Sequence, residues 1–297
     1  MPSRTLSPDI PVDLVETLRP MWRGRSDPTM RIRGAEVLRA SRTPDGPVTA
    51  RFAAGGSEVL VEAWGPGAAW LLEHAPGWCG ALDADGFDPP PGVVRGAWRR
   101  HRGLRIPRTG LVAEALVPVV LEQKVTGAEA RRAYARMCRA LGEPAPGPFG
   151  LTLPPDPARL AELPYFAFHP FGLERRRAEV LRALGASADR LDATASLPLA
   201  EAETTIGAFH GIGPWSVAEV ARIALGDADA VSVGDVHVPH VVAWALAGEP
   251  RGTDERMLEL LEPYRPHRGR VQLLLEAAAI RPPAFGPRMQ TRAIDRI

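Results

Sequence analysis

The sequence predicts a mainly α-helical protein with a small α+β domain in front of a larger, all-helical domain. Two periodicities and the chain length lead to this fold class. Over residues 31–63 polar and apolar side chains alternate as in half-buried strands, whereas from residue 111 to about residue 279 apolar side chains recur at helical spacing. A chain of 297 residues is long enough to bury two cores. We expect one domain over residues 1–104 and a second over residues 105–297.

The first domain is expected to hold a small antiparallel sheet with helices packed on it. Its strand-like runs are residues 31–33, 47–52 and 58–64. Asp45-Gly46 favours a turn between two of the strands. Residues 67–74 have the pattern of a helix, and the proline-rich residues 88–92 that of a linker. No chemistry is readable in this domain, so we expect it to brace the other one.

The second domain is expected to be helical, with breaks at proline-rich segments. The breaks are residues 143–148 and 154–157. Near the C-terminus, residues 257–262 and 268–280 have the apolar spacing of two further helices. The tail, residues 281–297, contains prolines, and we expect it to be loosely ordered.

A glycine hairpin between two helices is the first feature that indicates a ligand. Residues 196–209 are predicted as a helix capped by its first residue, and Gly211 and Gly213 end it because glycine adopts positive φ without a clash. Pro214 then fits the first turn of a new helix. The backbone of Gly211, Ile212 and Gly213 could therefore bind a DNA phosphate at a helix N-terminus. An ordinary tight turn between packed helices is the alternative.

A carboxylate follows the second helix, in the segment Val233-Gly234-Asp235. It leads an apolar run that consists of Val236, Val238, Val241, Val242 and Leu246. The simplest role of Asp235 is therefore that of a helix N-cap. This role is compatible with catalysis, because a cap fixes the carboxylate and the helix N-terminus favours its negative charge. An ionised carboxylate beside a sugar can stabilise an oxocarbenium-like centre and orient or deprotonate water.

Residues 211–216, Gly-Ile-Gly-Pro-Trp-Ser, followed by Val-Gly-Asp, resemble the helix-hairpin-helix DNA glycosylase superfamily. Within it the chain is most similar to the 3-methyladenine DNA glycosylase II family of alkylpurine glycosylases. Residues 120–130 resemble that family's segment that opens its helical domain and supplies a DNA-wedging turn. The resemblance covers about residues 105–280 well, and residues 1–104 only in outline, as the α+β domain that this family carries in front.

The resemblance implies a helix-hairpin-helix glycosylase that acts in base excision repair. It assigns catalysis to Asp235 and places Trp215 in the base pocket, with double-stranded DNA containing damaged bases as the partner and no cofactor. An indole suits this place, because a flipped, often cationic alkylated purine stacks well on its electron-rich face. The alternative for Trp215 is a core tryptophan.

Lys124 is the one lysine of the sequence, and this bears on the mechanism. Related glycosylases that also cut the DNA backbone place a lysine just after the hairpin, to form a Schiff base with the sugar. This chain has Trp215 there, so we expect a monofunctional enzyme that hydrolyses the N-glycosidic bond. Two alternatives remain: a non-catalytic helix-hairpin-helix DNA-binding protein, and a bifunctional glycosylase/lyase for oxidised bases.

Four further residues are predicted near the DNA, each with a solvated surface role as the alternative. Gln123 and Lys124 occupy the place where family members often wedge an apolar side chain into the DNA, so we expect both to contact DNA. Glu219 lies one turn after Trp215 on the same helix face, and could bind a purine edge or a cationic lesion. His267 matches a family position whose aromatic side chain lines the pocket.

The formal net charge is only +1, so any positive charge offered to DNA is local. Arginines gather in residues 95–108 and 131–139, and four phosphate contacts would give a log–log salt slope of about −3 to −4. Cys79 and Cys138 are too few for a metal cluster, so we expect no metal and a reducing compartment. The first residues lack a signal-peptide core, and no apolar run would span a membrane. We therefore expect a cytoplasmic, nucleoid-associated monomer.

Overall fold

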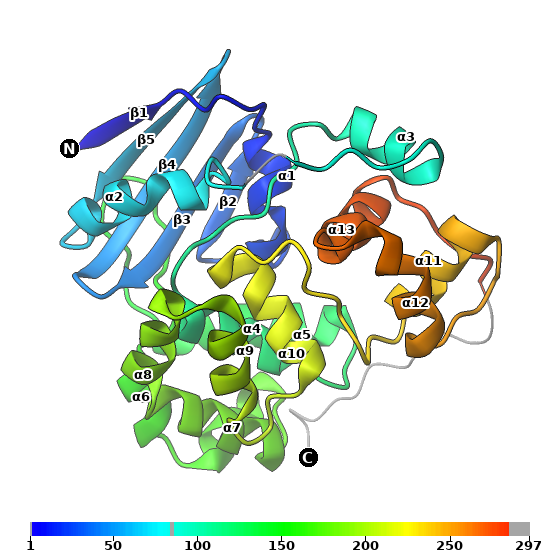
Figure 1. Cartoon of the computed structure of the whole chain (residues 1–297). Coiled ribbons are helices and arrows are strands. Elements are labelled where there is room, and N and C mark those ends of the chain that lie inside the picture. Colours follow the sequence, from blue (N-terminus) through cyan, green and yellow to red (C-terminus); the bar gives the residue numbers. More distant parts are fainter. Residues whose placement is uncertain (1, 84–85, 285–297) are drawn as a thin grey trace.

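Figure 1 shows the computed structural model of the chain, which describes residues 2–83 and 86–284. A sheet lies at one end, one group of helices packs against it, and a second group lies farther from it. The strands are β1 (Ser3–Leu6), β2 (Met30–Arg33), β3 (Glu36–Thr43), β4 (Gly46–Gly55) and β5 (Glu58–Trp64). They form one antiparallel sheet in the order β1-β5-β4-β3-β2. The predicted N-terminal sheet is therefore confirmed.

The turn predicted at Asp45-Gly46 joins β3 to β4. Thr43 pairs with Gly46, so the loop has two residues, and Gly46 has a φ of 114° that favours glycine. Strand β1 is absent from the sequence-based prediction. It is short, and it becomes a strand by pairing with β5, where Ser3 lies opposite Glu62.

Helices cover one face of the sheet. Helix α1 (Leu14–Leu18) packs on β3 and β4, and helix α2 (Ala68–Trp78) packs on β4 and β5. Helix α4 (Val112–Glu122) is joined to the sheet by the ion pair between Arg39 Nη2 and Glu114 Oε1, at 2.6 Å. The other face of β3 is covered by the segment after α5, where Leu38 and Ala40 share a cluster with Leu151 and Leu153.

The central helices share one hydrophobic core with the sheet. They are α5 (Gly127–Leu141), α6 (Pro157–Glu162), α7 (Arg175–Gly185), α8 (Ala188–Ala193), α9 (Leu199–Gly207) and α10 (Pro214–Val220). A π-helical turn over Ala221–Leu225 extends α10. The prolines predicted to break the helices do so, because α5 ends at Leu141 and α6 begins at Pro157.

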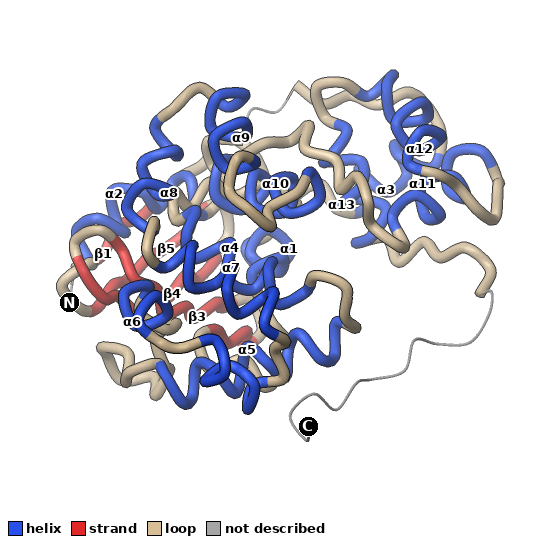
Figure 2. Tube along the Cα trace, turned by 90° about the horizontal axis from the view of Figure 1, so that it is seen from below, coloured by secondary structure: helices blue, strands red, loops and turns tan. Residues whose placement is uncertain are grey.

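A second group of helices has its own core and lies beside α10, away from the sheet (Figure 2). It consists of α3 (Val93–Arg100), α11 (Val238–Ala247), α12 (Asp254–Leu261) and α13 (Arg268–Ala277). Helix α3 packs on α13, so Val94 and Trp98 share a core with Val271 and Leu275. The division at residue 104 stays a prediction, and the packing groups residues from both sides of it.

A buried ion pair joins the end of the first part of the chain to α13. Arg270 Nη2 donates to Asp83 Oδ1, and the two side chains are 1% and 5% exposed. The other oxygen of Asp83 accepts a hydrogen bond from the Ile106 amide at 3.0 Å. Asp83 therefore holds both α13 and the segment that leads into α4.

Some predicted helix limits differ from the structure. Ser196 does not cap the helix before the hairpin, because it lies in a preceding 3₁₀ turn and its hydroxyl donates to the Ala193 carbonyl. Helix α9 begins only at Leu199, after Pro198. The basic run is helical over α3, and the last predicted helix ends at Ala277. Most of the predicted loose tail, residues 285–297, lies outside the described residues.

Within the described ranges no helix is both long and apolar enough to cross a membrane. No three histidine, cysteine or acidic side chains in those ranges are grouped so as to hold a metal ion. Cys79 and Cys138 are free and buried. Burial raises the pKa of the Cys79 thiol to about 12, so this thiol is unreactive at neutral pH.

Candidate functional site

The predicted hairpin connects α9 to α10. Gly211 has a φ of 87°, and a Cβ there would lie 2.4 Å from Val180 Cγ2, so the position requires glycine. Ile212 is 5% exposed and anchors the turn in the core. A Cβ added at Gly213 would meet no atom within 4 Å, so a ligand could approach this backbone closely. Pro214 opens α10 in its first turn, as predicted.

Gln123 differs from the prediction that it reaches out to DNA. Its amide nitrogen donates to the Gly211 carbonyl at 2.9 Å and to Ser216 Oγ at 3.0 Å. Both N–H groups of the amide are therefore engaged. The side chain ties the end of α4 to the hairpin, and so fixes the hairpin's position.

Lys124 follows at the tip of the loop between α4 and α5. Its side chain is exposed, and its backbone is left-handed, with a φ of 56° that is uncommon outside glycine. The loop is fixed on both sides, by Gln123 before it and by the capping box of Thr126 and Glu129 after it. The structure therefore presents the lysine on a rigid loop beside the hairpin.

Asp235 has a hydrogen-bond donor on each oxygen. Oδ1 accepts from the backbone amides of His237 and Val238, at 2.7 and 2.9 Å. Oδ2 accepts from Trp215 Nε1 at 3.1 Å. The carboxylate thus holds the turn that leads into α11, but Asp235 is not the predicted N-cap, because the helix begins at Val238 and His237 is its N-cap. Val236, which lies in the turn before α11, is 67% exposed. It therefore does not belong to the apolar helix face on which it is predicted.

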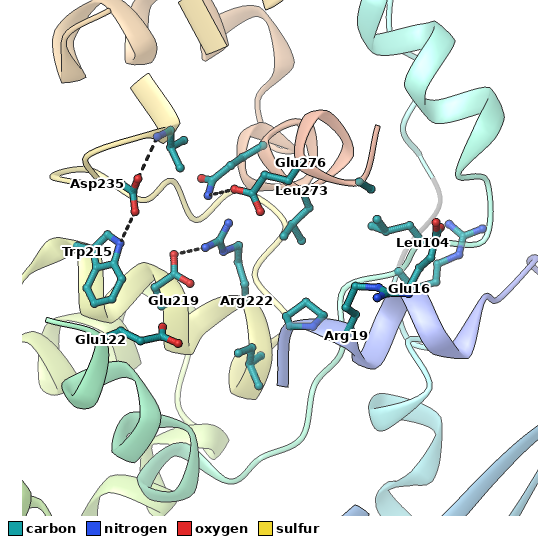
Figure 3. A pocket seen from close by; sticks show the side chains of 16 residues that line it. Glu16, Arg19, Leu104, Glu122, Trp215, Glu219, Arg222, Asp235, Leu273 and Glu276 are labelled. Atoms are coloured by element: carbon teal, nitrogen blue, oxygen red, sulfur yellow. Dashed lines mark hydrogen bonds and ion pairs between the residues drawn. The ribbon is translucent and has the colours of Figure 1, made fainter. Parts of the chain in front are cut away.

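A cavity of about 600 Å³ connects the predicted residues (Figure 3). Trp215, Glu219 and Asp235 all line it. Their elements, α10 and the loop before α11, form one wall, and α13 forms another. The far end is lined by Glu16, Arg19 and Pro20 from the first domain, so that domain contributes to the cavity instead of only bracing it.

Glu219 faces the cavity within a polar network. Its Oε1 pairs with Arg222 Nη2 and accepts a hydrogen bond from Ser232 Oγ at 2.6 Å. Ser232 Oγ also accepts from Gln272 Nε2 at 3.0 Å, which links the network to α13. These contacts hold Glu219 in the wall of the cavity. It is therefore not the solvated surface glutamate that the sequence left as the alternative.

Besides Glu16, the sequence reasoning did not single out two other carboxylates that line the cavity, Glu122 and Glu276. Burial raises the pKa of Glu122, the last residue of α4, and the charge of Glu219 raises it further against the opposing charge of Arg23. Glu276 on α13 also lines the cavity, with an exposed side chain. Helical spacing alone gave no sign that α13 would bring Glu276 opposite Glu219.

His267 is not among the residues that line the cavity. It immediately precedes α13, and its ring lies 5.0 Å from the ring of Phe87, centroid to centroid. Its Nδ1 accepts a hydrogen bond from Arg270 Nε at 3.3 Å. The prediction that His267 lines the pocket is therefore wrong for this structure, because its ring packs on the segment before α3.

The two predicted basic clusters also differ. Arg105 is 1% exposed and donates from Nε to the Pro11 carbonyl at 2.8 Å, so part of the first cluster serves the core. Arg131 and Arg132, one turn into α5, are exposed and follow the loop that carries Lys124. The exposed arginines of the second cluster thus follow Lys124 along α5.

Comparisons with known proteins agree with this fold. The profile of the HhH-GPD superfamily of base excision DNA repair proteins matches residues 117–266. A probable bifunctional transcriptional activator/DNA repair enzyme AlkA of Mycobacterium tuberculosis is 33% identical over 159 residues, which are 52% of this chain and 31% of that protein. The chain therefore spans less than a third of the length of this curated relative.

Two solved structures cover nearly the whole chain. A 3-methyladenine DNA glycosylase from Archaeoglobus fulgidus has a TM-score of 0.76 at 17% identity, over 92% of this chain and 97% of that one. An 8-oxoguanine glycosylase/lyase from Clostridium acetobutylicum has a TM-score of 0.69 at 13% identity, over 93% and 96%. These likenesses confirm the mostly helical fold with an N-terminal sheet domain. They do not separate alkylated from oxidised bases as the substrate.

Proposed function

Because the chain belongs to the HhH-GPD superfamily of base excision DNA repair proteins, we propose that it is a monofunctional DNA glycosylase for alkylated purines of the 3-methyladenine type. One observation carries the proposal. The Asp235 carboxylate and the Trp215 indole are hydrogen-bonded to each other on the wall of one cavity, beside the glycine hairpin. A purine flipped into this cavity could stack near the indole while its sugar faces the carboxylate.

Asp235 supplies the chemistry in this proposal. When the bond between C1′ and the purine nitrogen breaks, its electron pair goes to the base, and the sugar becomes an oxocarbenium ion. The carboxylate stabilises that cation, and water adds to C1′ and gives its proton to Asp235. An alkylated purine that is already cationic leaves as a neutral base, so the base needs no proton from the protein.

The hairpin and its neighbours hold the DNA in this proposal. The open backbone at Gly213 would bind a phosphate at the start of α10. Lys124 projects next to it, and Arg131 and Arg132 extend the positive surface along α5. Such contacts position DNA without reading its sequence, as suits an enzyme that searches for damage.

The lysine count supports hydrolysis over lyase chemistry. A lyase needs an amine that can form a Schiff base with the sugar. Trp215 stands directly after the hairpin, where the related lyases carry a lysine, and the sequence has no lysine other than Lys124. In the structure Lys124 belongs to the loop before α5, whereas Asp235 reaches the cavity from the loop before α11.

The test is release of bases from damaged DNA, followed by mass spectrometry of the freed bases. We expect 3-methyladenine and 7-methylguanine from methylated duplex DNA, and no release from a duplex that contains 8-oxoguanine. Borohydride should trap no covalent adduct with any substrate. Absence of release from methylated DNA by a protein that still binds DNA would leave the non-catalytic alternative, and a trapped adduct would favour the lyase.

A further inference from the structure

We propose that Asp254 is a positioning residue for the Asp235 carboxylate, and that it acts through the backbone of the loop that carries Asp235. The inference rests on the proposed function, in which Asp235 faces the sugar of the flipped nucleotide. Asp254 is not among the residues that line the cavity. Its effect on the reaction is therefore indirect, and it can be distinguished from a contact with the base.

Both carboxylate oxygens of Asp254 accept a hydrogen bond from the residue that precedes Asp235. The backbone N–H of Gly234 donates to Oδ1 and to Oδ2, each at 3.1 Å. Gly234 has a φ of 92°, and a Cβ added there would meet no atom within 4 Å, so the backbone conformation and not crowding requires glycine. In this conformation the amide reaches Asp254, and the next residue presents its carboxylate to the cavity.

The loop between Ser232 and α11 receives few hydrogen bonds from the rest of the protein. Ser232 is buried, and its amide donates to a side chain of α13 at 3.2 Å. For residues 233–237, the side chains of other described elements that form hydrogen bonds with the loop are Trp215 and Asp254. Trp215 holds the Asp235 carboxylate itself. Asp254 therefore holds the backbone between the buried serine and that carboxylate.

Trp215 and Asp254 come from different groups of helices. Trp215 lies in α10, one of the central helices, whereas Asp254 is the first residue of α12 in the second group. The loop is therefore hydrogen-bonded from both groups. If the contact with Asp254 is lost, the loop keeps the hydrogen bond from Trp215, which does not hold the backbone before the carboxylate.

The start of α12, which carries Asp254, is itself held in place beside α11 (Figure 1). The Gly252 amide donates to His240 Nδ1 at 3.1 Å, and a Cβ at Gly252 would lie 2.5 Å from a carbonyl oxygen of α11. Thr253 then caps α12 by accepting a hydrogen bond from the Arg256 amide at 3.2 Å. A carboxylate on a fixed element can define the position of a loop beside it.

The alternative is that Asp254 only stabilises its own helix. An acidic side chain in the first turn of a helix is favourable, and α12 has two of them, Asp254 and Glu255. Glu255 shares the charge and the helical turn, whereas the Gly234 amide donates to Asp254. Glu255 is therefore a matched control for the effect of charge on the helix.

The position of a reacting group affects the rate strongly, since a displacement of about 1 Å can cost about 10²-fold. Without Asp254, the Gly234 backbone can adopt the many conformations that are open to glycine. The Asp235 carboxylate would then face C1′ for a smaller fraction of the time. The hairpin and Lys124, which hold the DNA in the proposed function, would be unchanged. We therefore expect a slower cleavage step at unchanged DNA affinity.

The test measures release of methylated bases from duplex DNA under single-turnover conditions, with the protein in excess. Affinity is measured in parallel with a duplex that contains a tetrahydrofuran abasic-site analogue, which cannot be cleaved. Asp254→Ala should lower the cleavage rate about tenfold and change the affinity by less than about twofold. A cleavage rate equal to that of the wild type would overturn the inference.

Conservative and control variants separate the hydrogen bond from the charge. Asp254→Asn keeps an oxygen that can accept from Gly234, so its cleavage rate should stay within about threefold of the wild type. Glu255→Ala should cleave at the wild-type rate. A loss in Glu255→Ala equal to that in Asp254→Ala would show that only the helix charge matters. If Asp254→Ala does not fold, Asp254→Ser replaces it, because serine is shorter but is also favourable at the start of a helix.

A double variant shows whether Asp254 acts through Asp235. Asp235→Asn lacks the carboxylate that Asp254 positions. Adding Asp254→Ala to it should therefore lower the residual rate by less than about twofold. A further tenfold loss would show that Asp254 supports the fold or another group, and would overturn the inference.

This experiment can fail separately from the proposed function. If the wild type releases no methylated base, or if Asp235→Asn releases it at a normal rate, the proposed function or its catalytic residue is wrong. If Asp235→Asn is slow but Asp254→Ala is as fast as the wild type, the proposed function stands and only the role of Asp254 is overturned.

Discussion

The cavity wall that holds Asp235 and the wall that holds Glu276 are both acidic, but they are bound into the protein in different ways. Asp235 accepts two backbone hydrogen bonds and one from an indole, and Glu219 beside it is paired with Arg222 and Ser232. Glu276 on α13 has one neutral amide partner. The first wall is therefore preorganised, as a group that acts on a sugar must be. Glu276 on the second wall is held less firmly.

Replacing the central carboxylate should have the largest effect. Asp235→Asn can keep the two backbone hydrogen bonds through its carbonyl oxygen, but it removes the negative charge and sets an amide nitrogen against the Trp215 N–H. We expect base release under single-turnover conditions to fall by at least about 10²-fold, the low end for a positioned acid/base group. DNA affinity should stay within about twofold. A nearly normal rate would remove Asp235 from the mechanism.

Loosening the hairpin should have the next largest effect. Gln123→Ala deletes both hydrogen bonds that hold Gly211 and Ser216 in place. We expect affinity for duplex DNA to fall about tenfold, because a hairpin that is no longer held in place must be ordered when DNA binds, at a cost of about 1.4 kcal/mol.

The salt dependence of binding separates this positioning role from a direct contact. Gln123 is uncharged, so the log–log salt slope of Gln123→Ala should equal that of the wild type. Lys124→Ala should instead make the slope shallower by about one. A changed slope in Gln123→Ala would contradict a pure positioning role.

Removing one donor from the fixed wall should have a smaller effect. Trp215→Phe keeps an aromatic ring in the cavity but removes the hydrogen bond to Asp235 Oδ2. We expect the cleavage rate to fall about three- to tenfold, which corresponds to about 0.7–1.4 kcal/mol, the net worth of a typical hydrogen bond. An unchanged cleavage rate in Trp215→Phe would show that the hydrogen bond to Asp235 does not contribute to the reaction.

Outside the cavity, Glu203 and Asp227 form a pair of neighbouring carboxyl groups, and one of them has a raised pKa. Burial raises the pKa of Glu203 on α9 to about 7, helped by a hydrogen bond and the charge of Asp227 and by the charge of Asp229. The folded state therefore binds a proton more tightly than the unfolded state, whose glutamate has a pKa of 4.5. The stability that this proton gives is present below pH 4.5 and is lost as the pH rises through 7.

Glu203→Gln should therefore be more stable than the wild type at pH 8, by about 1 kcal/mol after allowance for solvent screening. The two proteins should approach each other at pH 4.5. Urea denaturation at the two pH values measures the difference. A constant difference would show that Glu203 does not titrate in this range.

The parts of the site that the sequence predicts are those that depend on local structure. Gly211 and Pro214 determine the hairpin through their own backbone preferences, and Trp215 and Asp235 lie at the start of one helix and in the loop before the next helix along the chain. Gln123 is found in the right segment, but its partner Gly211 is 88 residues away, so its orientation could not be read from the sequence.

The opposite wall depends on tertiary packing, and the sequence offers no signal for it. Glu276 lies on a helix whose apolar spacing fixes which face is buried, but not which cavity the other face borders. For His267 the expectation came from a matching position in a family. Such a match does not determine where the ring points, and here the ring packs against Phe87. Strand β1 escapes prediction for a similar reason, because its pairing with β5 and not its composition makes it a strand.

Because of the ion pair between Asp83 and Arg270, we expect the helical domain to be unstable when it is separated from residues 1–104. A fragment that begins at residue 105 would retain Arg270 on α13 but lose its counterion Asp83, together with Phe87 and α3, which pack against this helix. The same truncation would remove Glu16 and Arg19 from the far end of the cavity. We therefore expect that this truncation displaces α13 and opens the cavity to solvent.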